Sequence, residues 1–244
     1  MAEHVTGLRV LLVAVLMLPA CQPEPRDFDS LSVLDEDVIN WRYRGTVVSP
    51  DTREPYNGEV FASRWRGAVK DGFFDGPMTT YHRDGSERST GLFVGGLQEG
   101  PWQEWWGPEE PGSLLPTAPT GTIKWRGSYL GGQPHGAWEF YFTSGELMAK
   151  GAFDEGTWTG DWESYYGSGQ LRSRFTASVR VDESGRAYVT KSVHEAFEHD
   201  GSEMTAESAG NQPWYLCREM DPTRSTGITY NIYPSWSFRN RGRC

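Results

Sequence analysis

The sequence lacks several features that mark common protein classes. Apolar residues make up only 37% of the chain, below the roughly 45–50% of typical globular proteins. The longest apolar run, Val10–Leu18, is too short for a membrane-spanning helix, which needs about 20 residues. The net charge is −10 and no basic block is present, so we expect binding neither to nucleic acid nor to anionic lipid headgroups.

The sequence also has little that points to catalysis. It contains no phosphate-binding loop and no dinucleotide fingerprint. His194 and His199 are five residues apart, whereas the zinc-binding helix motif places its histidines four apart on one face. The acidic residues Glu104, Glu139 and Glu163 recur along the chain, and we interpret them as solvated edge charges. We therefore predict a non-enzymatic protein with no metal and no cofactor.

Glycine and aromatic residues are plentiful, and they repeat. The segment Gly127–Lys150 is followed by Gly151–Arg174, and three glycines that define the first copy have counterparts 24 residues later. The matched glycines are Gly127, Gly136 and Gly145 in the first copy and Gly151, Gly160 and Gly169 in the second. Repeats with periods of 20–50 residues indicate a stacked array of supersecondary units.

Each repeat carries two turn signals separated by strand-like segments. One signal is a dipeptide such as Asp84-Gly85 or Ser144-Gly145, which suits a tight hairpin because glycine accepts positive φ. The other is a five-residue frame bounded by glycines, such as Gly132–Gly136. The segments between turns are rich in aromatic and β-branched residues. This pattern predicts an all-β fold, an elongated antiparallel meander of 24-residue hairpin repeats.

Aromatic residues recur at two positions after the second glycine of each repeat. Two residues after it stand Trp138 and Trp162, and five residues after it stand Tyr141 and Tyr165. The two offsets differ in parity, so the two columns point to opposite faces of a strand. The candidate binding surface consists of Trp102, Trp105, Trp106, Trp138, Tyr141, Trp162 and Tyr165. The alternative is that these aromatics only stabilise the sheet.

The array extends over residues 41–176. A shortened first copy spans Tyr56–Trp65, and later copies begin at Gly67 and Gly91. The last turn of the Gly91 copy is replaced by an insertion at 107–121, a second candidate contact surface because repeat insertions usually lie on one face.

This combination of motifs resembles a known family. The pattern G-x-Y/F, G-x-W-x-x-Y-Y and S/D-G-x-L between Tyr56 and Phe175 is similar to MORN-type repeats, and the bacterial variant called the YwqK-like antitoxin family matches it best. The resemblance implies a mostly single-layer antiparallel sheet. It also implies roles as scaffold, dimerisation surface or, in some members, lipid binder. An antitoxin role does not carry over directly, because the N-terminus, the insertion and the tail depart from the family pattern.

The N-terminus predicts export. Residues 1–20 are typical of a secretory signal peptide, because Arg9 precedes the short apolar run Val10–Leu18 and the small residue Ala20 follows it. The tetrapeptide Leu18–Cys21 resembles the lipobox of bacterial lipoproteins. The resemblance implies lipidation of Cys21 and membrane anchoring through several acyl chains. Gln22 in place of aspartate favours the periplasmic face of the outer membrane in a diderm host. The alternative is an ordinary signal peptide with an incidental cysteine.

Residues 21–40 follow as the lipidated cysteine and a polar, Pro-rich tether. Within them Leu31–Ile39 is predicted as either a short helix or a first strand.

The C-terminal part departs from the repeat. Residues 177–210 predict a hairpin and a degenerate sixth copy, in which Phe197 takes the place of Tyr165. Residues 211–244 are interpreted as a cap that protects the last strand. With Cys21 lipidated, a disulfide between Cys217 and Cys244 is the default for an exported chain. The alternatives are two free thiols or pairing of Cys244 between molecules.

Three functions fit these features. The first is a cell-envelope lipoprotein that presents its repeat sheet as a protein-binding or scaffold surface. The second is an immunity or antitoxin-like protein against a toxin. The third is a module that binds envelope glycan through exposed Trp and Tyr. The expected partners are therefore a membrane through the lipid anchor, a protein of unknown identity, and an envelope glycan.

Overall fold

The computed structural model describes residues 24–34, 46–107, 118–181, 183 and 187–204. Nearly all regular structure in these residues is β-strand, and the helical part is one short 3-10 helix, η1. The elements are β1 Arg26–Asp27, η1 Phe28–Ser30, β2 Ser32–Leu34, β3 Thr46–Val48, β4 Gly58–Ala62, β5 Trp65–Lys70, β6 Phe73–Phe74, β7 Gly76–Tyr81, β8 Glu87–Val94, β9 Leu97–Trp105, β10 Ile123–Leu130, β11 Gln133–Tyr141, β12 Leu147–Asp154, β13 Thr157–Tyr165, β14 Leu171–Val181 and β15 Ala187–Ala196.

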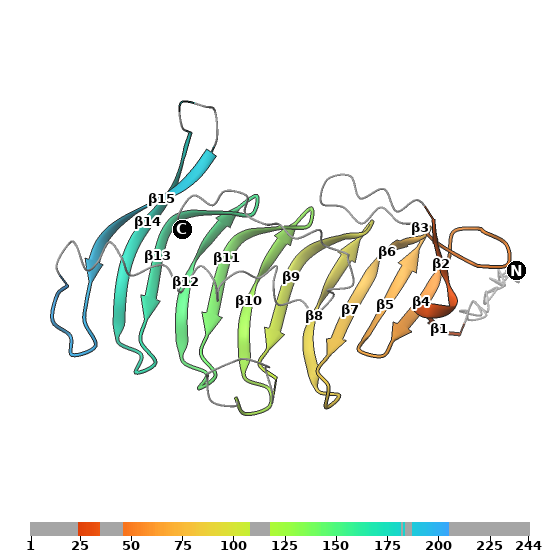
Figure 1. Ribbon diagram of the computed structural model, residues 1–244, viewed down its shortest axis with the longest axis horizontal. Helices are drawn as coiled ribbons and strands as arrows, with labels where there is room; N and C mark the ends of the chain where they lie inside the picture. The colour runs from red at the N-terminus through yellow and green to blue at the C-terminus, as the bar shows by residue number, and fades with distance from the viewer. Residues whose placement is uncertain (1–23, 35–45, 108–117, 182, 184–186, 205–244) are drawn as a thin grey trace, which may run out of the picture.

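The strands form one long open sheet whose neighbours follow the order of the chain (Figure 1). From β4 to β15 successive strands pair antiparallel, and the short β6 pairs with β5 beside this path. At the N-terminal end β1 pairs parallel with β4, while β2 and β3 form a separate two-stranded sheet. The predicted all-β meander is confirmed.

One kind of hairpin turn has only two residues. In Asp71-Gly72 both residues have positive φ, 50° and 82°, and Gly131-Gly132 has 57° and 82°. Two consecutive positive φ angles define a type I′ turn, whose twist matches that of the flanking strands. The five-residue frame expected here is therefore wrong. Strand β11 already begins at Gln133, and Gly136, the second glycine of the frame, lies inside that strand with a φ of 74°.

The other kind of turn repeats one hydrogen-bond pattern. The amide of Gly145 donates to the carbonyl of Phe142, and the amide of Phe142 donates to that of Glu146. The same pair of bonds closes the turns that begin at His82, Tyr166 and Glu198. The turn at Glu198 belongs to the predicted sixth copy, and Phe197 pairs there with Glu203. The turn pattern of the earlier copies thus recurs at Glu198, and β14 and β15 pair as a hairpin that extends beyond the neighbouring strands in Figure 1.

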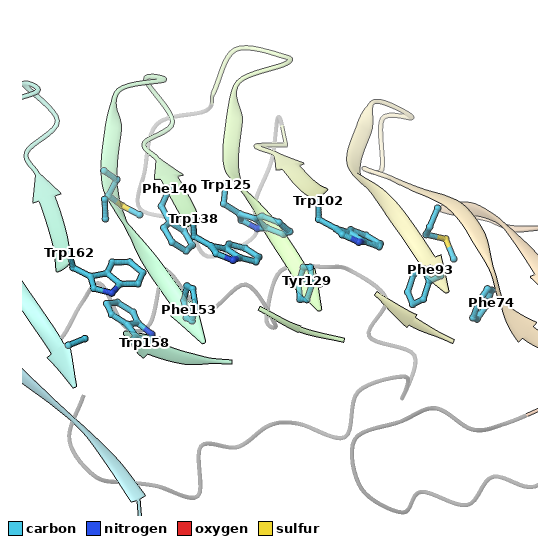
Figure 2. Close-up of a cluster of buried hydrophobic side chains, with 14 of the residues drawn as sticks. Phe74, Phe93, Trp102, Trp125, Tyr129, Trp138, Phe140, Phe153, Trp158 and Trp162 are labelled. Carbon is cyan, nitrogen blue, oxygen red and sulfur yellow. The ribbon is translucent and has the colours of Figure 1, made fainter. Parts of the chain in front are cut away.

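The core lies on one face of this sheet and consists mainly of aromatic rings (Figure 2). The rings of Trp102, Tyr129, Trp138, Phe153 and Trp162 follow one another in edge-to-face contacts, with centroids 5.3–6.0 Å apart. Such contacts add to the free energy gained by burying apolar surface. A single sheet thereby acquires a core, because each ring packs against rings from neighbouring repeats.

Glycine makes room for these rings. A Cβ atom built on Gly151 would lie 2.0 Å from the ring of Trp162, and one on Gly127 would lie 2.2 Å from Trp138. These distances are far below any real contact, so the flat indole needs a bare backbone beside it. The first glycine of each repeat is therefore a packing position.

The segment predicted as a tether is structured in part. Residues 26–34 form β1, η1 and β2, and the ring of Phe28 packs 5.1 Å from Trp65 and 5.8 Å from Phe74. This contact covers the N-terminal end of the aromatic core. Of the segment Leu31–Ile39, for which the sequence left helix or strand open, Ser32–Leu34 form the strand β2, and residues 35–39 lie outside the described residues. The signal peptide at 1–20, Cys21 and the cap at 211–244 lie outside the described residues.

Candidate functional site

The two faces of the sheet differ in what they expose. The inner face, defined by Trp102, Trp138 and Trp162, is buried, and these three side chains are only 1–2% exposed. The outer face carries the residues of opposite parity on the same strands, among them Glu139 on β11 and Glu163 on β13. The predicted opposite orientation of the two aromatic columns agrees with this alternation.

The residues of the predicted binding surface are divided between the two faces. Trp102, Trp138 and Trp162 pack in the core and are only 1–2% exposed. Trp105, Tyr141 and Tyr165 lie on the outer face and are half-buried. Trp106 is half-buried too, and its indole N–H donates to the carbonyl of Tyr141 at 3.1 Å. The outer-face aromatics therefore remain candidates, whereas the inner-face ones have a packing role.

Charged side chains of alternating sign cross the outer face in one line. Strand register places Arg126 opposite Glu139, Glu139 opposite Lys150, and so on to β15. This charged row consists of Arg126, Glu139, Lys150, Glu163, Arg174 and Glu195. Its members come from six consecutive strands, β10 to β15, and opposite charges directly across strands stabilise a sheet.

Close contacts join most neighbours in the charged row. Arg126 forms an ion pair with Glu139. Glu163 accepts from Lys150 at 2.9 Å and from Arg174 at 2.9 Å, and Arg174 also donates to Glu195 at 2.9 Å. Because each of these pairs bridges two strands, the row holds the outer face in a defined arrangement.

Two tyrosines of the outer aromatic column join this network. The hydroxyl of Tyr141 donates to Glu139 at 2.7 Å, and that of Tyr165 donates to Glu163. Burial and the bond to Glu139 raise the pKa of Tyr141 to about 12. The hydrogen bonds from Tyr165, Lys150 and Arg174 lower the pKa of Glu163 to about 2. Both tyrosines therefore stay protonated and both carboxylates stay ionised at neutral pH.

A shallow groove lies at the start of the charged row, over β8 to β11. Its volume is about 590 Å³. Residues that line it are Thr90, Gly91, Pro101, Trp102, Gln103, Arg126, Gly127, Ser128, Ala137 and Glu139. The line of cross-strand neighbours that forms the charged row extends into the groove, because Gln103 lies opposite Arg126 on one side and opposite Thr90 on the other. Here the alternating charges give way to uncharged polar groups.

Glu104 does not belong to this outer surface. The interpretation of Glu104 as a solvated edge charge is wrong, because its side chain is fully buried and its carboxylate lies 3.2 Å from the ammonium of Lys124 and 3.7 Å from Arg88. Glu104 stands four residues after the second glycine of its repeat, whereas Glu139 stands three after its own. That one-residue difference turns the side chain to the inner face, beside Trp125.

The histidines singled out by the sequence do not come together as metal ligands. His194 lies on β15, where its Nε2 is 2.7 Å from the hydroxyl of Thr176, and His199 lies in the following turn against the ring of Tyr166. Thr176 donates to Asp161 at 2.6 Å, so its oxygen accepts from His194. A histidine that donates to the hydroxyl cannot act as its base. No group of three potential metal ligands occurs among the described residues.

Several predicted sites lie beyond the described part of the chain. They are the lipidation site Cys21, both cysteines of the expected disulfide, Cys217 and Cys244, and most of the insertion at 107–121. In the parts of the chain that the structure describes, no helix has the length and apolar character to cross a membrane.

Comparison with known proteins gives no family assignment. No protein-family model matches the chain, and no curated protein matches it.

Proposed function

We propose that this chain is a non-enzymatic binding protein of the cell envelope, which presents the outer face of its repeat sheet to a ligand. The observation that carries the proposal is the contrast between the faces. The inner aromatics are buried in one continuous core, while the outer face keeps an exposed charged row with half-buried tyrosines beside it. A rigid surface with regularly placed polar groups is suited to recognition, since little entropy is lost when its side chains engage a ligand.

The envelope location rests on the N-terminal sequence. If Cys21 is lipidated, only residues 22–25 separate the anchor from β1, and four extended residues span at most about 14 Å. The N-terminal end of the sheet would then lie close to the membrane surface. The later repeats, with the charged row on β10 to β15, would extend away from that end.

The scaffold role proposed from the resemblance to MORN-type arrays uses the same surface. A protein partner and an envelope glycan are both ligands that an exposed sheet face can bind, and an immunity role would need a toxin as the protein partner. The outer face supports binding in general. An experiment that offers the chain both envelope proteins and envelope glycans distinguishes the two ligand classes.

The experiment compares two immobilised proteins in one envelope extract. One is the chain from residue 22, and the other carries Arg126→Gln, Lys150→Gln and Arg174→Gln on the outer face. The extract is separated into protein and glycan fractions, and bound material is quantified by mass spectrometry and sugar analysis. We expect one component to be retained by the unmodified chain and lost by the variant. Equal retention of every component by both proteins would contradict a binding role for this face.

A further inference from the structure

We propose that the ligand of the outer face is an uncharged glycan of repeating sugar units, laid across the strands along the charged row. This inference rests on the proposed binding function and names the ligand class. It follows from three properties of the row: its spacing, its hydrogen-bonding capacity and its charge balance.

The spacing is that of a repeated site. One module consists of Arg126, Glu139 and Tyr141, and the next consists of Lys150, Glu163 and Tyr165, with each residue shifted by 24 positions. The modules lie two strands apart, which corresponds to about 10 Å across a sheet. Two similar sites separated by one repeat interval fit a polymer of repeating units.

The modules offer both donors and acceptors. Arg126 uses one of its guanidinium N–H groups within the described residues, and its side chain is 54% exposed. Lys150 is 47% exposed. Within the described residues Glu139 accepts from Arg126 and Tyr141 on a single oxygen, Oε2, which leaves Oε1 for a donor. Glu163 in the second module accepts on both of its oxygens, so this free acceptor belongs to the first module. Sugar hydroxyls both donate and accept, so they can satisfy the two kinds of group at once.

The charge balance favours an uncharged ligand. Three cations and three carboxylates alternate in the row, so the row attracts neither sign at a distance. The whole chain carries −10, which repels polyanions. Glycans without charge avoid this repulsion and still bind through hydrogen bonds.

The groove is the expected binding position of the first sugar unit of the glycan. It lies where the row changes from charged to neutral polar groups, and Thr90, Gln103 and Ser128 line it. Its volume of about 590 Å³ lies within the range of small-ligand sites. From the groove a bound glycan would pass over Arg126 and Glu139 toward Lys150.

The test measures binding of oligosaccharides of increasing length by titration calorimetry. The probes are β-1,4-linked N-acetylglucosamine oligomers and the matching glucose oligomers, with two to six units. Because the second module adds an intramolecular binding event, we expect the six-unit form of the recognised series to bind at least roughly tenfold more tightly than its two-unit form. Polygalacturonate, an anionic glycan, should bind more weakly than the recognised neutral series.

Matched variants connect the binding to the row. Arg126→Gln with Lys150→Gln removes two cations from the outer modules, and Arg64→Gln with Lys70→Gln removes two exposed cations elsewhere. We expect the first pair to weaken binding of the six-unit glycan by roughly tenfold or more and the second pair to change it less than twofold. Circular dichroism of both variants confirms that the sheet is retained.

The inference would be overturned by no binding in either neutral series, by affinity independent of length, or by equal weakening by both pairs. Tighter binding of polygalacturonate would also overturn it. If the envelope extract yields a protein that depends on the outer face while glycans do not bind, the binding function stands and the glycan assignment falls. If nothing in the extract depends on that face, both fall.

Discussion

The inner and outer faces of the same strands are organised by different forces. On β11 to β13 the inner face is stabilised by close packing, since the rings of Trp138 and Trp162 lie against the backbone of Gly127 and Gly151. The outer face is held by pairs of opposite charge between strands, as in Lys150 with Glu163. Shape-based packing tolerates little change, whereas exposed ion pairs contribute less each and are screened by salt. The inner face therefore accounts for stability, and the outer face is free to serve recognition.

The largest effect is expected from removing an inner-face ring. Trp138→Ala should lower the free energy of unfolding by about 4 kcal/mol, because the ring is 1% exposed and contacts rings on both sides. Urea denaturation followed by circular dichroism measures it. The matched outer-face change, Tyr141→Ala, should cost less than half as much. Equal losses from the two substitutions would show that the faces do not differ in this way.

The next largest effect is expected from filling the space beside a ring. Gly151→Ala places a methyl group 2.0 Å from the ring of Trp162, and we expect a loss of about 3 kcal/mol. Gly167→Ala is the control, because nothing lies within 4 Å of its Cβ position. The double variant Gly151→Ala with Trp162→Leu should lose less than the sum of the single changes, since the smaller side chain relieves the clash. Strict additivity would contradict the packing role of Gly151.

A smaller effect tests the polar part of the inner face. The hydroxyls of Ser164 and Ser173 are 2.7 Å apart and buried. Ser164→Ala leaves the hydroxyl of Ser173 without this partner, which should cost about 1–2 kcal/mol. The double variant Ser164→Ala with Ser173→Ala should cost no more than the single change, because no buried hydroxyl is then left unsatisfied. A double variant that loses twice as much would contradict this account.

The sequence predicts the inner face better than the outer one for a physical reason. The glycine spacing and the parity of the aromatic columns are properties of one strand at a time, so Trp138 and Trp162 could be placed on the same face from the repeat alone. The charged row depends on which residue lies opposite which across strands. Arg126 and Glu139 belong to different strands and different repeat positions, and a bulge at Gly127 shifts their register. That shift is not visible in the repeat pattern.

Glu104 shows that an offset of one residue decides whether a side chain lies on the inner or the outer face. Its carboxylate and that of Glu139 differ by one position within the repeat, and period-two alternation puts one in the core and the other on the surface. The offset from the second glycine was the available signal, and counting it for each carboxylate separately would have distinguished them. The turn at Asp71-Gly72 was a similar case, since the dipeptide alone suits a two-residue hairpin.

The smallest effect concerns the charged row and depends on pH. The folded-state pKa of Glu163 is lowered to about 2 from its ordinary 4.5, so its stabilisation is complete above about pH 4.5 and is lost as the pH falls toward 2. Glu163→Gln should therefore lower the free energy of unfolding at pH 7 by no more than about 1 kcal/mol, since the side chain is 23% exposed and partly screened. The difference between the variant and the unmodified chain should shrink steadily between pH 4.5 and 2.

Denaturant titrations at several pH values measure that difference, with Glu87→Gln as a control for removing an exposed carboxylate outside the row. Added salt should reduce the Glu163 effect at pH 7, because screening weakens the pairs with Lys150 and Arg174. It should leave the loss from Trp138→Ala unreduced, since that loss comes from packing. A Glu163 effect that is as large as the Trp138 effect, or that persists at pH 2, would place the charged row among the main sources of stability. The two faces would then not differ in their contribution to stability.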